Sequence, residues 1–116
     1  MNAKKQKPII GISIGDINGI GVEVTLRALA DNRVYKSFTP LIYGHGKVIT
    51  FYRKLMSLED FNFSQIRSLD EIQHRKVNVI NVMEEAPEVI PGVETAEASK
   101  MALEALKAAV NELLKK

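Results

Sequence analysis

The chain contains no cysteine among its 116 residues, which excludes disulfides and sites where thiolates hold zinc or an iron–sulfur cluster. A large excess of charge is also missing, because 16 basic and 14 acidic residues leave a net charge of only +2. That balance gives no argument for nucleic acid or an anionic membrane as a partner. No apolar run approaches the ~20 residues of a membrane-spanning helix, and no signal-peptide core follows the basic N-terminus. We therefore expect a cytoplasmic protein that binds neither nucleic acid nor membranes.

The remaining composition is that of an ordinary globular domain, with 46% hydrophobic and 26% charged residues. A chain of 116 residues is long enough to bury one core. The first residues are rich in lysine, so we predict a solvated basic tail over residues 1–7. Residues 8–116 then form a single α/β unit.

Strand-like and helix-like patterns alternate along the chain. Short runs rich in isoleucine and valine predict strands over residues 8–14, 39–44 and 76–82. The first run is almost continuously apolar, which predicts burial on both faces, as in a parallel sheet. Residues 61–69 stay open between a strand in "FNFSQI" and a helical turn in "SLDEIQ". The alternation predicts a three-layer α/β/α arrangement with a mostly parallel sheet.

Apolar spacings of three and four residues predict three helices. The first has the stripe Val22, Leu26 and Leu29, and ends near Asp31. The second has the stripe Val48, Phe51, Tyr52, Leu55 and Met56. The third begins after Thr95, which can cap it, and Lys115 and Lys116 suit its negative end. Its predicted buried face consists of Ala98, Ala102, Leu106, Ala109 and Leu113, widened by Met101, Leu103, Val110 and Leu114.

The stretch "SIGDINGIGVEV" connects the first strand to the first helix and holds three glycines, at 15, 19 and 21. The spacing G-x-x-x-G-x-G matches neither the dinucleotide fingerprint nor a P-loop. The loop nevertheless follows a strand at the edge where open α/β sheets bind ligands, and it leads into a helix N-terminus that suits phosphate. Asp16 could accept from a ligand hydroxyl or cap the loop. Asn18 tolerates a left-handed backbone.

Other polar residues offer weaker candidates. The two histidines, His45 and His74, have no carboxylate at metal-ligand spacing, so no metal site is predicted. His45 could line the crevice, although a solvent-exposed or capping histidine is the simpler interpretation, and His74 is expected on the surface. Lys47 could assist a phosphate, although a solvated lysine is the simpler interpretation. The acidic residues 84–88 predict an exposed loop. No nucleophile is paired with a base, so no catalytic residue is predicted.

Two segments resemble one enzyme family. "PIIGISIGDINGIGVEVTLRAL" resembles the opening of the 4-hydroxythreonine-4-phosphate dehydrogenases of vitamin B6 biosynthesis, and "ETAEASKMALEALKAAVNELL" is similar to a later helix of that family. Ile17 and Val22 stand where the family often has prolines. A related loop occurs in isocitrate and isopropylmalate dehydrogenases. The matching loop residues are Gly15, Asp16, Gly19, Ile20, Gly21 and Glu23.

The resemblance implies the N-terminal third of a two-domain protein with an isocitrate and isopropylmalate dehydrogenase-like fold. Such proteins act as homodimers and oxidise 4-phosphohydroxy-L-threonine with NAD or NADP and a divalent metal held by histidines. Neither histidine of this chain matches a ligand motif, so the chain alone is expected to be inactive and to hold no cofactor fully. The alternative is a non-catalytic nucleotide-binding or anion-binding module. Candidate cofactor contacts are Gly15, Asp16, Asn18, Gly19, Ile20 and Gly21.

Overall fold

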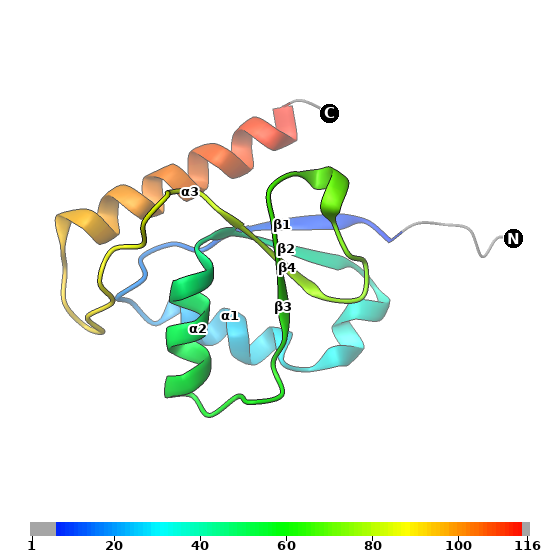
Figure 1. Cartoon of the computed structure of the whole chain (residues 1–116), viewed down its shortest axis with the longest axis horizontal. Coiled ribbons are helices and arrows are strands. Elements are labelled where there is room, and N and C mark those ends of the chain that lie inside the picture. Colours follow the sequence, from blue (N-terminus) through cyan, green and yellow to red (C-terminus); the bar gives the residue numbers. More distant parts are fainter. Residues whose placement is uncertain (1–6, 115–116) are drawn as a thin grey trace, which may run out of the picture.

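The structure is a computed structural model that describes residues 7–114, without the side chains of residues 32 and 35. Most of the predicted basic tail and the two C-terminal lysines therefore lie outside the described residues. The strands are β1 (Ile9–Ser13), β2 (Thr39–Gly44), β3 (Phe63–Ile66) and β4 (Val77–Asn81). The α-helices are α1 (Gly21–Leu29), α2 (Gly46–Leu55) and α3 (Ala96–Leu114). Short 3₁₀ turns cover Asn32–Lys36 and Leu69–Glu71, and Figure 1 shows how the elements follow one another.

The four strands form one sheet in the order β1-β2-β4-β3, and every neighbouring pair is parallel. The sheet thus has one strand more than the sequence predicted. The additional strand is β3, and it is followed by the 3₁₀ turn Leu69–Glu71. Both patterns are therefore real, because the strand lies within residues 61–69 and the turn begins at the end of that segment.

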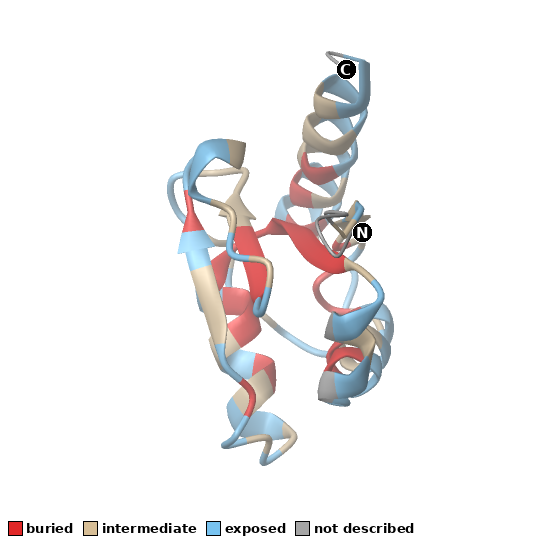
Figure 2. Ribbon diagram, turned by 90° about the vertical axis from the view of Figure 1, so that its right-hand side faces the viewer, coloured by how far each residue is buried: buried red, intermediate tan, exposed pale blue. Residues whose placement is uncertain are grey.

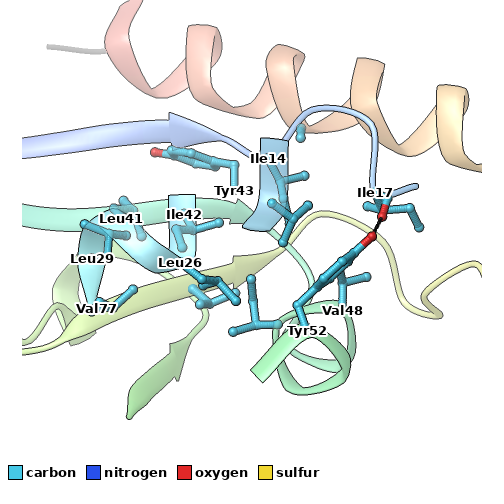
Figure 3. Close-up of a cluster of buried hydrophobic side chains, with 14 of the residues drawn as sticks. Ile14, Ile17, Leu26, Leu29, Leu41, Ile42, Tyr43, Val48, Tyr52 and Val77 are labelled. Atoms are coloured by element: carbon cyan, nitrogen blue, oxygen red, sulfur yellow. Dashed lines mark hydrogen bonds between the residues drawn. The ribbon is translucent and has the colours of Figure 1, made fainter. Parts of the chain in front are cut away.

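The sheet is covered on both faces, as predicted for three layers. Residues paired across parallel strands point to the same side, so Ile42 and Val79 share a face. That face packs on α1 and α2, where Leu26 and Tyr52 meet it (Figure 3). Helix α3 packs on the opposite face, over β1 and β2 (Figure 1). Figure 2 shows the buried residues concentrated in the sheet and in the helix turns that face it.

The two N-terminal strands differ in burial. All six residues of β2 are buried, because β2 lies between β1 and β4 and helices cover both of its faces. The expectation that the first strand is also buried on both faces is wrong. Ile10 is 45% exposed, and Gly11 is exposed as well. Strand β1 stands at the edge of the sheet, where no other element of the described part of the chain covers Ile10.

The predicted stripe of α1 is confirmed, because Val22, Leu26 and Leu29 are all buried. In α2 the prediction is partly wrong. Phe51 and Leu55 are exposed, and Ile49 is buried in their place. Buried Tyr52 is part of the core, as expected, and the exposed Phe51 ring meets the Tyr52 ring edge-on.

The predicted face of α3 is partly wrong. Ala98 and Met101 are buried as expected, but Ala105 is buried as well, whereas Leu106 is 51% exposed. The small side chains let α3 approach the sheet closely, and the leucines are displaced to the flank of the helix. The predicted cap is confirmed, because Thr95 Oγ1 accepts a hydrogen bond from Ala98 N at 3.1 Å. None of the helices in the described part of the chain has the length and apolar character needed to cross a bilayer.

Candidate functional site

The glycine loop, residues 14–21, leaves the carboxyl end of β1 and enters α1. Ile14 continues the pairing with β2 for one residue, because its N–H donates to the carbonyl of Tyr43 at 3.1 Å. Gly15 follows with a φ of +74°, a left-handed conformation that only glycine adopts without strain. No atom lies within 4 Å of the position that a Cβ on Gly15 would occupy. The side of Gly15 on which a Cβ would stand is therefore open.

Asp16 holds the shape of this turn. Its carboxylate Oδ1 accepts a hydrogen bond from Asn18 N at 2.9 Å, and its carbonyl accepts one from Gly19 N at 3.0 Å. This pattern is an Asx turn, in which a short acidic side chain replaces a backbone acceptor. The side chain of Asp16 is exposed, so the loop-capping role expected as one alternative is the one that the geometry displays.

Ile17 and Asn18 fasten the base of the loop to the core. Ile17 is fully buried, and its carbonyl accepts a hydrogen bond from the Tyr52 hydroxyl of α2 (Figure 3). Burial raises the pKa of Tyr52, with smaller contributions from the charges of Glu23 and Asp16, so the hydroxyl is kept as a donor. The sequence indicated neither contact, because nothing in the local pattern links residues 35 positions apart.

Asn18 joins the loop to the segment before α3. The side chain is only 3% exposed, and its Oδ1 accepts from Ile90 N at 2.7 Å. Its Nδ2 donates to Thr95 Oγ1 at 3.4 Å, and its carbonyl accepts from Gly92 N at 2.7 Å. The residue does not use the left-handed backbone conformation that it tolerates. Both polar atoms of its amide are instead engaged within the chain.

The crest of the loop is open. Ile20 is 78% exposed, Gly21 is exposed, and no atom lies within 4 Å of a Cβ built on Gly21. The first helical bond of α1 runs from Val24 N to the carbonyl of Ile20. Within residues 7–114, the backbone N–H groups of residues 21, 22 and 23 have no acceptor. Such amides at a helix N-terminus can donate to a carboxylate or phosphate.

One charge opposes an anion at this position. Glu23 lies in the first turn of α1 and is half-buried, so its carboxylate uses the same positive end of the helix. The donors of this loop fit one anionic group held by backbone amides. They do not form a closed pocket around a whole nucleotide.

The polar groups that follow β2, the strand next to β1, are engaged in hydrogen bonds within the chain. His45 follows β2 and caps α2, because its Nδ1 accepts from Lys47 N at 3.1 Å and its Nε2 lies 3.3 Å from the carbonyl of Glu84. The next amide, Gly46 N, donates to Asn81 Oδ1 at 2.9 Å. His45 is buried and its capping role is confirmed, while Lys47 is exposed. Asn81 was missed, although an asparagine at the end of an apolar strand is a recognisable signal.

An open cavity of about 620 Å³ lies at the carboxyl ends of β3 and β4. It combines one cation, Arg67, with the carboxylates of Glu71 and Glu84. Strands β1 and β3 are the two edge strands of the sheet. The glycine loop follows β1, whereas this cavity lies beside β3, so the two are at opposite edges of the sheet. The acidic residues 84, 85 and 88 are exposed in a loop, as predicted.

The second histidine is placed differently from the prediction. His74 is half-buried rather than on the surface, and its Nδ1 lies 2.7 Å from the hydroxyl of buried Thr39. Thr39 begins β2 and His45 follows its end, so the two histidines lie at opposite ends of the sheet. Among the described residues there is no group of three histidine, aspartate or glutamate side chains that could hold a metal ion. On their own, the described side chains therefore do not fit a divalent metal.

An all-parallel α/β sheet with an open glycine turn after its first strand defines a class of ligand-binding α/β proteins. The chain is 36% identical to a 4-hydroxythreonine-4-phosphate dehydrogenase of Bacteroides thetaiotaomicron over 109 residues, which is 94% of this chain and 30% of the relative. It is 32% identical to a "Putative D-threonate 4-phosphate dehydrogenase" of Halalkalibacterium halodurans, over 90% of this chain and 32% of that relative. No protein-family profile matches the chain.

The fold comparison agrees with the sequence comparison. A solved structure of a "putative 4-hydroxythreonine-4-phosphate dehydrogenase" from Salmonella typhimurium superimposes with a TM-score of 0.78 at 18% identity, over 95% of this chain and 35% of that one. The chain thus spans about a third of the length of these relatives. It is related to the 4-hydroxythreonine-4-phosphate dehydrogenases, and the resemblance seen in its two segments is confirmed.

Proposed function

We propose that this chain is the N-terminal portion of an NAD(P)-dependent, divalent-metal-dependent dehydrogenase that oxidises 4-phosphohydroxy-L-threonine in vitamin B6 biosynthesis. The observation that carries the proposal is the 36% identity to the Bacteroides enzyme across 94% of the chain. The complete protein is a cytoplasmic homodimer in this proposal. The 116 residues alone are inactive, because they supply no group of metal ligands among the described residues.

The contribution of the chain is the glycine loop. We place Gly19, Ile20 and Gly21 against the cofactor, because the crest is open at Ile20 and Gly21 and the amides of residues 21–23 have no acceptor among the described residues. Gly15, Asp16 and Asn18 also belong to the proposed cofactor loop, which their turn and anchoring bonds hold in position. When bound, NAD(P) supplies the hydride acceptor. The metal-dependent chemistry is assigned to the part of the protein that this chain does not include.

The proposed substrate is a small phosphorylated hydroxy acid that carries an amino group. The names of the two relatives disagree about the amino group, because hydroxythreonine phosphate carries one and threonate phosphate does not. Both compounds therefore belong in the assay. The match to the hydroxythreonine enzyme, 36% identity over 94% of this chain, favours the amino compound.

A chimaeric enzyme tests the proposal. The matched 109 residues of the Bacteroides dehydrogenase are replaced by the corresponding residues of this chain, and NAD(P) reduction is followed with either substrate and a divalent metal. We expect turnover by the chimaera, faster with 4-phosphohydroxy-L-threonine, and none by the 116 residues alone. A folded chimaera without activity, or full activity of the short chain, would contradict the proposal.

The open amides also suit a non-catalytic anion-binding module, and calorimetry on the short chain separates the two functions. NAD, ADP and inorganic phosphate are titrated in turn. Binding of phosphate or ADP by the short chain, together with an inactive chimaera, would favour the module. An active chimaera favours the dehydrogenase, whatever the short chain binds.

A further inference from the structure

Helix α3 carries a row of exposed apolar side chains that no described element covers. The row is called the α3 flank and consists of Leu103, Leu106, Val110 and Leu113, with exposed fractions of 51%, 51%, 43% and 70%. Their spacing of three, four and three residues repeats that of a helix seam that packs against another helix. The opposite flank carries Lys100, Glu104 and Lys107, so the two flanks differ sharply in polarity.

The α3 flank continues into the surface of β1. An apolar groove of about 200 Å³ runs between Val110 and Leu113 of α3 and the strand residues Ile9, Gly11 and Tyr43. Strand β1 is an edge strand, so its outer row of backbone N–H and C=O groups has no partner strand among the described residues. An exposed helix flank and an unpaired edge thus adjoin each other, and such edges pair readily with another strand.

The crossover connections indicate what fits this surface. Parallel strands are joined by right-handed crossovers, and the connection from β1 to β2 through α1 runs over one face of the sheet. Helix α3 lies on the other face, over β2 and β1. A right-handed crossover on that face must run in the opposite direction, so a strand that followed α3 would lie beyond β1 and parallel to it.

The relatives contain the polypeptide that could provide such a strand. The chain matches 30% of the Bacteroides enzyme and 35% of the Salmonella structure, so about two-thirds of each relative has no counterpart here. We propose that the β1 edge and the α3 flank form the interface for that remaining polypeptide, which adds a parallel strand to β1 and packs an apolar helix on α3. This proposal rests on the place in the dehydrogenase assigned above.

Co-expression tests the interface without any ligand. A tagged copy of this chain is produced together with the untagged remainder of the Bacteroides dehydrogenase, and the purified material is examined by light scattering. We expect a 1:1 complex. The double variant Leu106→Glu/Val110→Glu should weaken co-purification at least tenfold, whereas Leu55→Glu should not, because Leu55 is an equally exposed leucine on α2. Hydrogen exchange should slow at the β1 amides that are not paired with β2.

Three outcomes would overturn the proposal. One is failure of the remainder to co-purify, including a remainder that stays insoluble beside the chain. Another is a complex that the double variant does not weaken. The third is a homodimer of this chain that persists in the presence of the remainder and is lost in the double variant, since a second copy would then occupy the surface. No NAD(P), metal or substrate is present, so these outcomes are independent of turnover by the chimaera.

Discussion

The hydroxyl of Tyr52 donates a hydrogen bond to the backbone carbonyl of Ile17, which joins the base of the glycine loop to helix α2. Both residues are fully buried. The loop therefore combines a base that is fixed in the core with a crest that is open at Ile20 and Gly21. A ligand that meets the crest meets a backbone that is already positioned.

Replacing the donor should weaken the protein without disturbing its packing. We expect Tyr52→Phe to lower the free energy of unfolding by about 1–3 kcal/mol, because the buried carbonyl of Ile17 loses its partner. Urea denaturation measures the change. Tyr43→Phe is the matched control, since the Tyr43 ring is also buried but its hydroxyl makes no hydrogen bond to any described residue. Equal losses for the two variants would contradict this role of the hydrogen bond.

The Tyr52 hydroxyl should also make the stability of the protein depend on pH. Burial raises the pKa of Tyr52 above the value of about 10 for the unfolded chain, so the folded state favours the protonated phenol. The resulting stabilisation is complete below about pH 10 and is lost as the pH rises through the raised pKa. The advantage of the natural protein over Tyr52→Phe should therefore shrink above that pH. Urea midpoints of both proteins between pH 7 and 11 test this, and a constant difference would contradict it.

Replacing Asn18 should loosen the segment before α3, which is distant from the loop in sequence. Asn18→Ala removes the acceptor of Ile90 N and the donor to Thr95, and we expect it to cost about 2–3 kcal/mol. Amide exchange at Ile90 should accelerate. Asn62→Ala is the control, because exposed Asn62 only donates to the nearby carbonyl of Asp60. Unchanged exchange at Ile90 in Asn18→Ala would show that the contact does not order this segment.

Gly21, at the start of α1, and Gly44, at the end of β2, should respond oppositely to alanine. Gly21→Ala places a methyl group in open space at the start of α1, so stability should stay equal or rise by up to about 1 kcal/mol. Gly44→Ala places it 2.7 Å from Ile14 Cδ1 in the core, and we expect a loss of about 1–3 kcal/mol. Thermal denaturation separates the two.

The Gly21→Ala variant also tests the proposed cofactor site. In the chimaera, Gly21→Ala should lower activity although the protein is as stable as before, because the methyl group occupies the space proposed for the cofactor. An unaffected rate and KM for NAD(P) would remove Gly21 from the site.

Residues whose environment is set by neighbours in sequence could be predicted. The strand Thr39–Gly44 and the buried stripe of α1 follow from local apolar patterns, and Thr95 was recognised as a cap because caps act within one turn. Apolar patterns alone could not show that β1 lies at an edge, because the same isoleucines would fill a central strand. The order of strands is a property of the whole chain.

The flank of α3 shows a second limit. Leucine and alanine are both apolar, so the pattern selected the longest apolar stripe and placed Leu106 in the core. The structure instead buries Ala98, Met101 and Ala105, where α3 packs over β1 and β2. For the candidate site, the sequence located the open glycines, but it could not show that Tyr52 and Ile90 anchor the loop, since both contacts depend on tertiary folding.

The order of the strands has a consequence for synthesis on the ribosome. Among the strands of residues 7–114, β3 pairs only with β4, which is made after it, so residues 63–66 have none of these strands to join when they first emerge. They must wait until residues 77–81 have left the exit tunnel and been inserted beside β2. A nascent chain that stalls before residue 77 therefore exposes both edges of β3 at once, and a translational pause there would favour misassembly.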